Sequence, residues 1–346
     1  MRLSVAVSYA DDPTDWLRTL PDLERAGLDM VWLSEAYSFD AVSVAGAVAQ
    51  RTTRLQIGTG ILNVFSRSPA VLAMTAATLD HLSGGRFTLG LGASGPQVVE
   101  GFHGVPYRQP VERLLDVTRI CRAVWAREPL DYQGRAVTVP LPAGEGTGQG
   151  KPLRLVNHPL RADIPVVWAS LGPRAVRLAA QVADGWLPIF YYPEKAAAAF
   201  GEALAQGAAE RSPALGPLDV VAGGAVAVDD AGAVAAAIGA ARSQLALYVG
   251  GMGSRSTNFY NDLVRRYGFV VEAERIQELF LAGRKQEAVA AVPEELVLAT
   301  NLIGSSADVR ARLDAYRAAG VTTFSASSLG TDPVTTVARL RRLADA

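Results

Sequence analysis

The chain has 346 residues, of which 49% are hydrophobic and 19% charged, so it can bury a sizeable core and is not a disordered sequence. Its formal net charge is −1 and it has no block of basic residues, which argues against nucleic acid as a partner. The one cysteine, Cys121, allows neither an internal disulfide nor a cysteine-based metal cluster. The amino-terminal residues lack the long apolar run of a signal peptide, and no stretch approaches the roughly 20 apolar residues of a membrane span. We therefore expect a cytoplasmic protein without a membrane partner.

Short apolar runs typical of buried strands alternate with helical segments from one end of the chain to the other. The predicted strands lie at 3–7, 30–33, 55–61, 86–91, 164–169, 185–188, 218–228 and 322–327. The main predicted helices lie at 16–26, 41–50, 69–82, 111–125, from 173, from 194, at 231–247, at 305–320 and from 333. Eight strand–helix units over this length favour a closed (β/α)8 barrel of the α/β class, a TIM barrel. We expect one domain over residues 1–346, because no linker divides the chain.

The segments between these units carry signals of their own. Residues 130–139 predict a small hairpin with its turn near Gln133–Gly134, and the stretch 140–152 is rich in Gly and Pro and predicts a loop. Residues 92–110 also predict a loop. Residues 257–291 predict an extra helical region, which would be an insertion in the last third of the chain. Ser305 with Asp308 has the spacing of a capping box and predicts the start of a helix.

The run Gly90-Leu-Gly92-Ala-Ser-Gly95 matches the dinucleotide fingerprint GxGxxG and follows a predicted strand. That fingerprint opens directly into a helix, and an acid follows about 20 residues later at the end of a second strand. Here a loop is predicted to follow, and the spacing falls at Glu112 and Asp116 inside a predicted helix. We therefore reject a Rossmann site. The remaining interpretations are a strand end that lets backbone approach a ligand closely, or a plain tight turn.

Two further segments fall at predicted strand ends, where a barrel places its functional groups. The sequence Ala-Ser-Leu-Gly at 169–172 precedes Pro173 at the start of a predicted helix. Free N–H groups at a helix N-terminus can bind a phosphate, and ordinary capping is the alternative. The glycines in Gly-Thr-Gly-Ile-Leu-Asn at 58–63 indicate a bulge or a strained peptide at a functional strand end, or a simple bend.

Few side chains are candidates for acid–base work. Glu35 and Glu100 follow predicted strands, where a carboxyl group beside an apolar ring system can act as a proton donor. Taken alone, each fits a solvated loop acid better. The histidines at 81, 103 and 158 lack metal-binding spacing, so no metal site is predicted. We expect His81 to be structural, whereas His103 and His158 lie in loops that can reach the barrel mouth. There is no GxSxG motif or P-loop, so hydrolase chemistry has no support.

Several segments, in the right order, resemble the deazaflavin-dependent branch of the luciferase-like monooxygenases. They read VWLSEAYSFDA, TGILNVFSRSPA, AATLDHLSGGRF, GLGASGPQVVEGFHGVPY and IPVVWASLGPRAVRLAAQVADGWLP. The likeness covers most of the chain and is greatest to methylenetetrahydromethanopterin-reductase-like oxidoreductases. It implies that the deazaflavin coenzyme F420 binds at the carboxyl end of the barrel, with FMN as the alternative.

The resemblance also implies a set of cofactor-binding residues, namely Gly60, Ile61, Asn63, Ser94, Ala169, Ser170, Leu171 and Gly172. A non-prolyl cis peptide between Gly60 and Ile61 would form a bulge under the deazaflavin ring. The segment 170–172 would bind the phosphate, Asn63 would reach the polar edge of the ring, and Ser94 would reach the cofactor's chain. The coenzyme would carry out the chemistry, while the protein would position it and exclude water.

The resemblance implies that Glu100 is catalytic, because it lies at a position where related dehydrogenases keep an acid, and Glu35 is the second catalytic candidate from its place after a predicted strand. Where alcohol and sugar-phosphate dehydrogenases of this group carry an Asp-His pair after the second strand, this chain has Glu35-Ala36. The difference favours hydride transfer from F420 to a C=N or an activated C=C bond over alcohol oxidation, unless His103 or His158 replaces the missing histidine. One alternative is an FMN-dependent monooxygenase that uses dioxygen and reduced flavin. Another is a non-catalytic flavin-binding barrel.

Loops at the barrel mouth are expected to determine the substrate, which we predict to be a small organic molecule. They are residues 8–9, Tyr37, 140–152, Tyr191–Tyr192 and 250–256. These loops offer aromatic and small polar groups, without the arginine cluster that a phosphorylated substrate would need. The resemblance further implies a homodimer, formed through helices near the second and third strands.

Overall fold

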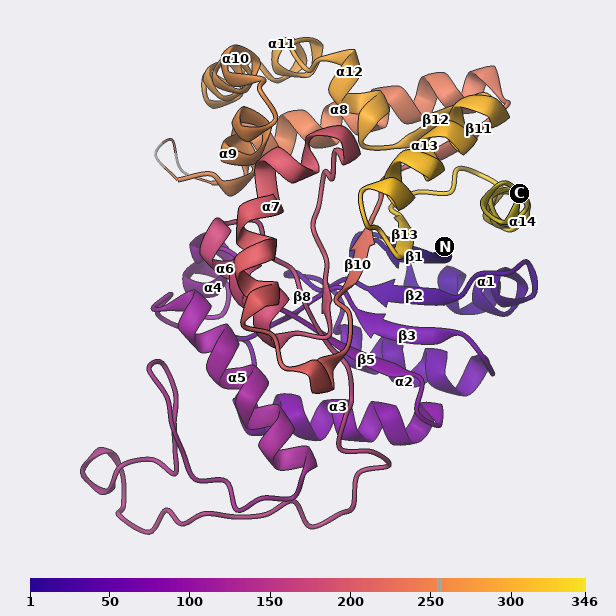
Figure 1. Cartoon of the computed structure of the whole chain (residues 1–346). Helices are drawn as coiled ribbons and strands as arrows, with labels where there is room; N and C mark the ends of the chain where they lie inside the picture. The colour runs from indigo at the N-terminus through magenta and orange to yellow at the C-terminus, as the bar shows by residue number, and fades with distance from the viewer. Residues whose placement is uncertain (254, 256) are drawn as a thin grey trace.

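The computed structural model of the chain describes residues 1–253, 255 and 257–346. Within this part of the chain, parallel strands close into an eight-stranded barrel (Figure 1). In order around the barrel they are β3 (Gln56–Thr59), β2 (Met30–Leu33), β1 (Arg2–Val7), β13 (Thr323–Ala326), β10 (Asp219–Ala222), β9 (Gly185–Trp186), β8 (Val166–Trp168) and β5 (Phe87–Gly92). The barrel closes because β3 pairs with β5 as well as with β2. The predicted (β/α)8 barrel is confirmed.

A ring of helices surrounds the barrel, and each helix packs against its two neighbours. The ring consists of α1 (Pro13–Arg25), α2 (Ala41–Arg51), α3 (Pro69–Ser83), α5 (Pro110–Trp125), α6 (Pro173–Val182), α7 (Pro193–Ala209), α13 (Ser306–Ala318) and α14 (Pro333–Asp345). Side-chain caps define where many of them begin. The predicted capping box of Ser305 and Asp308 at α13 is confirmed. The two chain ends lie near each other beside α1 and α14 (Figure 1).

The seventh strand ends earlier than the predicted range 218–228. After β10 the chain bends at Gly223 and Gly224, and β11 (Val226–Val228) leaves the barrel to pair with β12 (Leu302–Gly304). A Cβ atom at Gly223 or Gly224 would lie 2.2 or 2.3 Å from a neighbouring backbone oxygen. Only glycine fits this bend, which divides one predicted strand into two.

The helical insertion is larger than the predicted range 257–291. It runs between β11 and β12 and consists of α8 (Ala231–Gly251), α9 (Phe259–Arg266), α10 (Val270–Leu281), α11 (Lys285–Ala290) and α12 (Glu294–Ala299). The sequence predicts α8 as the helix that covers the seventh strand. Instead, α8 packs against the other insertion helices, and α13 occupies the place in the ring between α7 and α14. Figure 1 shows the insertion as a layer beside the barrel.

Among the described helices, α8 is the one that is long and apolar enough, by length and composition, to cross a membrane. Its apolar residues are mostly alanine, and Arg242, Ser243 and Gln244 interrupt them. It packs against β11, β12 and the other insertion helices. One such helix is only weak evidence for a membrane span.

Two connections also differ from the predictions. The stretch 92–110 is not all loop, because α4 (Pro96–Gly101) follows directly after Gly95. A helix therefore does follow the GxGxxG-like run, but β5 belongs to a closed barrel, so the rejection of a Rossmann site stands. The predicted hairpin is present as β6 (Tyr132–Gln133) and β7 (Thr138–Val139), with a longer turn than predicted. The loop that follows contains one turn of 3-10 helix, η1 (Ala143–Glu145).

A bulge interrupts the third strand, which resumes as β4 (Leu62–Asn63). The step from Gly58 to Leu62 is four residues, whereas the step between their partners on β5 is three, so the third strand carries one extra residue. Thr59 Oγ1 accepts the Gly90 N–H and donates to Gly90 O, both at 2.9 Å. The Thr59 side chain thus replaces the ladder hydrogen bonds that the bulge interrupts.

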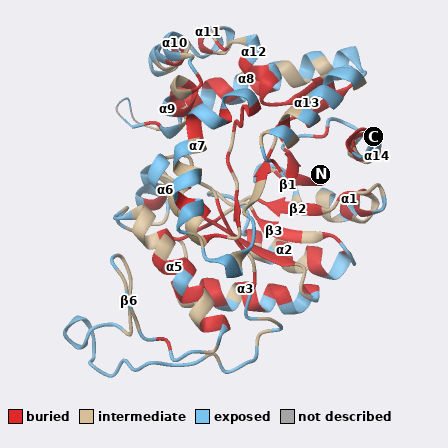
Figure 2. Cartoon of the chain, viewed as in Figure 1, coloured by how far each residue is buried: buried red, intermediate tan, exposed pale blue. Residues whose placement is uncertain are grey.

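Large side chains fill the barrel interior beneath this bulge. Trp32 packs with Met30, Val167 and Val221, all of them buried. Figure 2 shows the strands β1, β2 and β3 mostly in the colour of buried residues. A Cβ atom at Gly58 would lie 2.4 Å from the Trp32 ring. The barrel is therefore a packed core up to its carboxyl end, and a ligand can bind only above this layer.

Replacing Gly90 with alanine should strongly destabilise the protein, because the new Cβ atom would lie 1.7 Å from Thr59 O. We expect a loss of about 3 kcal/mol or more in the free energy of unfolding, the upper range for overpacking. Gly46→Ala is the matched control, since no atom lies within 4 Å of its Cβ position and it sits within α2. Alanine there should stabilise by roughly 0.5–1 kcal/mol. Urea unfolding measures both, and a neutral Gly90→Ala result would contradict the packing described for the bulge.

Candidate functional site

The bulge lies at the carboxyl end of the barrel and contains the peptide bond between Gly60 and Ile61, which is cis as the resemblance implies. A Cβ atom at Gly92 would lie 2.8 Å from the Ile61 side chain, and one at Gly90 would overlap Thr59 O. The glycines of the GxGxxG-like run therefore let β5 approach the bulge. Gly90 and Gly92 form part of β5 itself, and not the tight turn that was one of the two interpretations, while Gly95 is the N-cap of α4.

Asn63 follows the bulge and carries a buried polar atom without a partner. The residue is 5% exposed, and its Oδ1 accepts the Phe65 N–H at 3.0 Å. Its Nδ2 is buried and makes no hydrogen bond to any described residue. A buried donor left unpaired costs about 1–3 kcal/mol. The position is therefore suited to donate to an acceptor on a bound molecule.

Ser170 presents a second unpartnered atom at the end of β8. Its Oγ is buried and has no hydrogen-bond partner among the described residues, while its backbone oxygen accepts Trp186 Nε1 at 2.9 Å. Two residues later, Gly172 caps α6 without any side-chain hydrogen bond to the helix N-terminus. The space beside Gly172 is open, since a Cβ atom there would meet nothing within 4 Å. No side chain of this segment therefore caps the N-terminus of α6. The free N–H groups of that helix end are suited to bind an anion.

Arg266 of the insertion holds the loop at residues 169–172 in place. Its guanidinium donates to Leu171 O at 2.9 Å and to Ala199 O at 2.8 Å, and it lies over the Phe200 ring at 5.2 Å. The residue anchors the loop to α7 and α9 together. The sequence offered no signal for it, because Arg266 lies 95 residues from Leu171.

Aromatic side chains from distant segments meet over the mouth. Tyr9 follows β1, and Tyr107 donates its hydroxyl to Ser94 O, after β5, at 3.1 Å. Tyr260 of α9 interacts electrostatically with both Tyr9 and Tyr107. Because Tyr9 follows β1 and Tyr107 lies after β5, three strands away around the barrel, Tyr260 is near segments from two sides of the mouth. The insertion therefore forms part of the roof of the site.

Three buried phenols near the mouth, those of Tyr107, Tyr248 and Tyr260, stay protonated at neutral pH. Tyr248 packs edge-on against Tyr260 with ring centroids 4.8 Å apart, and both rings contact Phe190 after β9. Burial raises the pKa of Tyr248, Tyr260 and Tyr107 above the ordinary tyrosine value, and neighbouring phenols add to the effect. These groups can donate a hydrogen bond or a proton at neutral pH, but they do not serve as bases there.

Glu35 is engaged in an ion pair and is not a free acid. Arg67 binds it bidentately at 2.6 and 2.9 Å, and the Ala41 N–H donates to Glu35 Oε2 at 3.2 Å. The Glu35 side chain is 9% exposed and the Arg67 side chain is 17% exposed. Arg67 also pairs with Asp40. Hydrogen bonding to Glu35 raises the pKa of Arg67 despite its burial. This geometry supports a structural role for Glu35, which joins α2 to the segment after β4. Its role as a proton donor stays a prediction without support from these contacts.

Glu100 and Ser94 both lie at the β5 side of the mouth. Glu100, on α4, is exposed and accepts the Tyr107 N–H at 3.0 Å. Ser94 is exposed, has a φ of 57° in the left-handed region, and accepts the Tyr107 hydroxyl through its backbone oxygen. Both residues help to position Tyr107. Their roles in catalysis and cofactor binding stay predictions.

Of the three histidines, only His103 lies near the mouth, just after α4. The centroid of its ring is 5.3 Å from that of Phe102. His81 is exposed in the last turn of α3. His158 contacts Arg127 at 2.8 Å beyond the end of α5. Because both helices end at the amino-terminal side of the barrel, the expectation that His158 reaches the mouth is wrong.

Two of the predicted specificity loops also lie elsewhere. Tyr191 and Tyr192 are buried and bond to Ala319 O and Glu295 Oε1, so Phe190 takes the mouth position instead. The loop 140–152 extends away from the barrel mouth beyond the hairpin (Figure 1). Tyr37 is exposed and contacts Phe102 near the mouth. In the segment 250–256, Ser254 and Ser256 lie outside the described residues.

Replacing Arg67 with methionine should leave the Glu35 carboxylate buried without a partner. We expect a loss of about 3 kcal/mol in the free energy of unfolding, as for other broken buried ion pairs. Arg18→Met is the control, because Arg18 pairs with Asp15 on the surface, where such pairs contribute about 0–1 kcal/mol. Chemical denaturation measures both variants. An Arg67→Met protein of unchanged stability but lost activity would favour a catalytic Glu35 instead.

Comparison with known proteins extends these observations. The family described as luciferase-like monooxygenase matches residues 1–323. A protein of Mycobacterium tuberculosis with the provisional name coenzyme F420-dependent oxidoreductase is 40% identical, over 98% of this chain and 99% of its own length. The 5,10-methylenetetrahydromethanopterin reductase of Archaeoglobus fulgidus is 27% identical over 88% of this chain and 86% of its own.

A solved structure shows the same architecture. The coenzyme F420-dependent tetrahydromethanopterin reductase of Methanopyrus kandleri superimposes with a TM-score of 0.79 at 24% identity, over 98% of this chain and 96% of that one. This likeness shows the fold, while the family match and the 40% identical relative concern sequence. The chain therefore belongs to the luciferase-like monooxygenase family, on its coenzyme F420-dependent oxidoreductase branch.

Proposed function

We propose that this chain is an oxidoreductase that transfers a hydride between the deazaflavin coenzyme F420 and a small organic substrate. The observation that carries the proposal is the pair of buried, unpartnered atoms at the mouth, Asn63 Nδ2 and Ser170 Oγ, beside the uncapped N-terminus of α6. A molecule with a polar ring edge and a phosphate satisfies these groups together. The relatives named for coenzyme F420 support the choice of cofactor.

The residues present fit such a cofactor. Asn63, with its unpartnered Nδ2, would donate to the polar edge of the ring, and the bulge at Gly60–Ile61, which lies next to Trp32, would hold the ring. The segment 170–172 and the N-terminus of α6 would bind the phosphate, with Arg266 holding the segment in position. When bound, the coenzyme supplies the hydride acceptor or donor. The chain supplies the position, the shape of the mouth and the exclusion of water.

The substrate class follows from the proton donors over the mouth. Reduction of a C=N or an activated C=C bond adds a hydride to one atom and a proton to the other. The Tyr260 phenol can donate a hydrogen bond to the atom that takes up this proton from solvent, whereas alcohol oxidation needs a base. Ala36 stands where related alcohol dehydrogenases carry a histidine, which leaves His103 as the histidine near the mouth. We therefore favour an imine or enone reductase.

Turnover of the reduced coenzyme tests this function. The protein is mixed with reduced F420 and a panel of cyclic imines and enones, and the visible absorbance of the oxidised coenzyme is followed. We expect oxidation that depends on the substrate and proceeds without oxygen uptake. Oxygen consumption with reduced FMN would instead identify an FMN-dependent monooxygenase, and no turnover with either cofactor would favour a non-catalytic barrel.

Asn63→Ala and Ser170→Ala should each weaken coenzyme binding. Each substitution removes a polar group that has no partner in the free protein and would form one hydrogen bond to the bound coenzyme. We expect about a tenfold rise in Kd for each, equivalent to roughly 1.4 kcal/mol. Fluorescence titration with oxidised F420 measures the effect. Ser243→Ala is the control, since its hydroxyl bonds only within α8. Unchanged affinity in both site variants would contradict the proposed cofactor position.

We further propose that the chain forms a homodimer through α2 and α3. The outer face of α3 exposes Val71, Met74 and Leu82, which lie at helical spacing on one side. Exposed apolar side chains grouped in this way are typical of protein interfaces. The partners proposed for the chain are a second copy and a small-molecule substrate.

The double variant Val71→Glu/Met74→Glu should be monomeric, because it places two charges in the proposed interface. Light scattering after size exclusion should give twice the chain mass for the wild type and the chain mass for this variant. Val270→Glu/Val271→Glu alters an exposed apolar pair on α10 and should remain dimeric. If only the α10 variant dissociates, the interface lies on the insertion instead.

A cytoplasmic location remains part of the proposal. The single thiol, Cys121, is buried, and burial raises its pKa to about 12. Such a thiol is unreactive, and it gains nothing from an oxidising compartment.

A further inference from the structure

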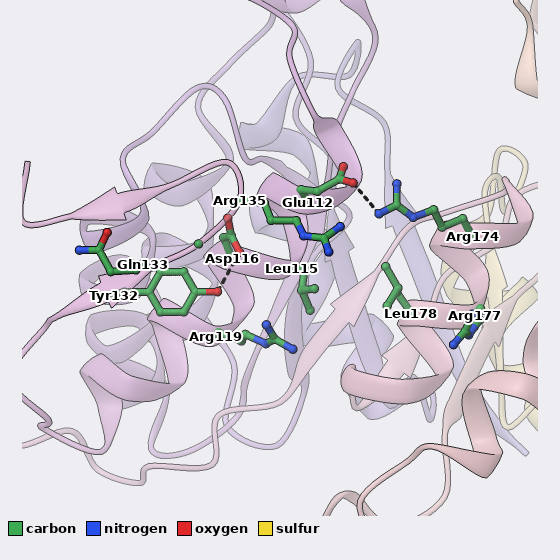
Figure 3. A pocket seen from close by; sticks show the side chains of 11 residues that line it. Glu112, Leu115, Asp116, Arg119, Tyr132, Gln133, Arg135, Arg174, Arg177 and Leu178 are labelled. Atoms are coloured by element: carbon green, nitrogen blue, oxygen red, sulfur yellow. Dashed lines mark hydrogen bonds and ion pairs between the residues drawn. The ribbon is translucent and has the colours of Figure 1, made fainter.

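A cavity of about 470 Å³ lies on the outer wall of the barrel, away from the tyrosines of the mouth. It is enclosed by α5, α6 and the hairpin of β6 and β7, and we call it the α5–α6 cleft (Figure 3). Its volume falls within the roughly 300–1,000 Å³ of small-molecule sites. The packing of the mouth does not require it, so it needs a separate explanation.

Four arginines line the cleft, and each of the three elements around it contributes at least one. Arg119 comes from α5, Arg135 from the turn of the hairpin, and Arg174 and Arg177 from α6. Two acids, Glu112 and Asp116, also line it, so two positive charges remain. Such a concave, positively charged surface attracts anionic ligands.

Both acids are already engaged. Asp116 accepts the Tyr132 hydroxyl at 2.8 Å and the N–H groups of the hairpin residues 136 and 137 at 2.8 and 3.0 Å. Glu112 pairs with Arg174. A Cβ atom at Gly134 would lie 2.3 Å from Asp116, so the hairpin is pressed tightly against α5. The cleft is therefore preformed, and its acids are used to build its wall.

The arginines retain unused donor capacity. Arg119 interacts with the Tyr132 side chain and Arg135 with the charge of Glu112. Neither arginine forms a salt bridge with a described carboxylate, and both are exposed. Arg177 pairs with Glu210 outside the cleft, and its Nε is buried without a hydrogen-bond partner. Charge-assisted hydrogen bonds to carboxylates satisfy donors of this kind.

The position of the cleft connects it with the phosphate site. Arg174 is the second residue of α6 and follows Gly172 by two positions, so the cleft begins at the helix N-terminus proposed to bind the phosphate. Arg177 lies about one turn, or roughly 5 Å, farther along the same helix. A ligand tail that extends from the phosphate into the cleft and carries several carboxylates would pass the four arginines that line it.

We propose that the α5–α6 cleft binds the acidic tail of the coenzyme. Beyond its phosphate, coenzyme F420 continues into a lactyl group and γ-linked glutamates, each with a free carboxylate, whereas FMN ends at the phosphate. The cleft therefore distinguishes the two cofactors at a place remote from the ring. This inference rests on the proposed function and specifies how the same cofactor is held.

Paired titrations with two forms of the coenzyme test the proposal. One form carries two or more glutamates, and the other ends at the phospholactyl group. We expect the wild type to bind the glutamylated form at least tenfold more tightly at low salt, with a smaller ratio at high salt because the contacts are charged. In Arg119→Ala/Arg135→Ala the ratio should fall towards one, while the Kd for the tail-less form stays unchanged. Both side chains are exposed, so the variant should fold.

Arg310→Ala, an exposed arginine on α13, is the matched control and should keep the wild-type ratio. Equal binding of the two forms by the wild type, or a full ratio in the double variant, would overturn the proposed tail site while leaving the cofactor assignment intact. Failure of the wild type to bind either form would overturn the proposed function itself, and the tail site with it.

Discussion

The hydrogen bonds between the Thr59 side chain and the Gly90 backbone fix the place where the third barrel strand bulges, and the rest of the site depends on that place. One extra residue in a strand exchanges the faces to which the following side chains point. The bulge therefore sets the orientation of Asn63 relative to the strand below it. It also raises the Gly60–Ile61 segment above the packed Trp32, which gives the mouth its floor. Glycines on β5 are needed because no side chain fits beside this segment.

The insertion provides the opposite wall of the site. Asn258 and Asn261 bond to backbone oxygens of α8 and α10 and so fix α9 against its neighbours. From that one short helix, Tyr260 extends over the mouth and Arg266 holds the loop at Leu171. The roof of the mouth and the loop at residues 169–172 are therefore connected through α9. In the proposed account, binding of the coenzyme at α6 and closure of the mouth by tyrosines both depend on the position of α9.

Local patterns were sufficient for the barrel but not for its exceptions. Alternating apolar runs and capped helices predict the strands and most of the ring because these signals act within a few residues. The bend at Gly223 and Gly224 looks like the interior of a strand in sequence, and only contacts with distant backbone show that the strand must divide there. The substitution of α13 for α8 in the ring likewise depends on tertiary packing.

For the site, Asn63 and Ser170 were predicted through the resemblance, and their unpartnered atoms support it. Tyr260 and Arg266 carry no motif and were missed, because their roles arise from contacts with residues far away in the chain.

The central claim is that the mouth is built for a deazaflavin with a phosphate-bearing chain. Parallel equilibrium titrations of the purified wild-type protein with oxidised coenzyme F420 and with FMN test it most directly. We expect a micromolar or lower Kd for F420 and binding of FMN weaker by about tenfold or more, a difference of roughly 1.4 kcal/mol. Equal or tighter binding of FMN would contradict the claim and would make an oxygen-using flavin enzyme the better explanation of the same barrel.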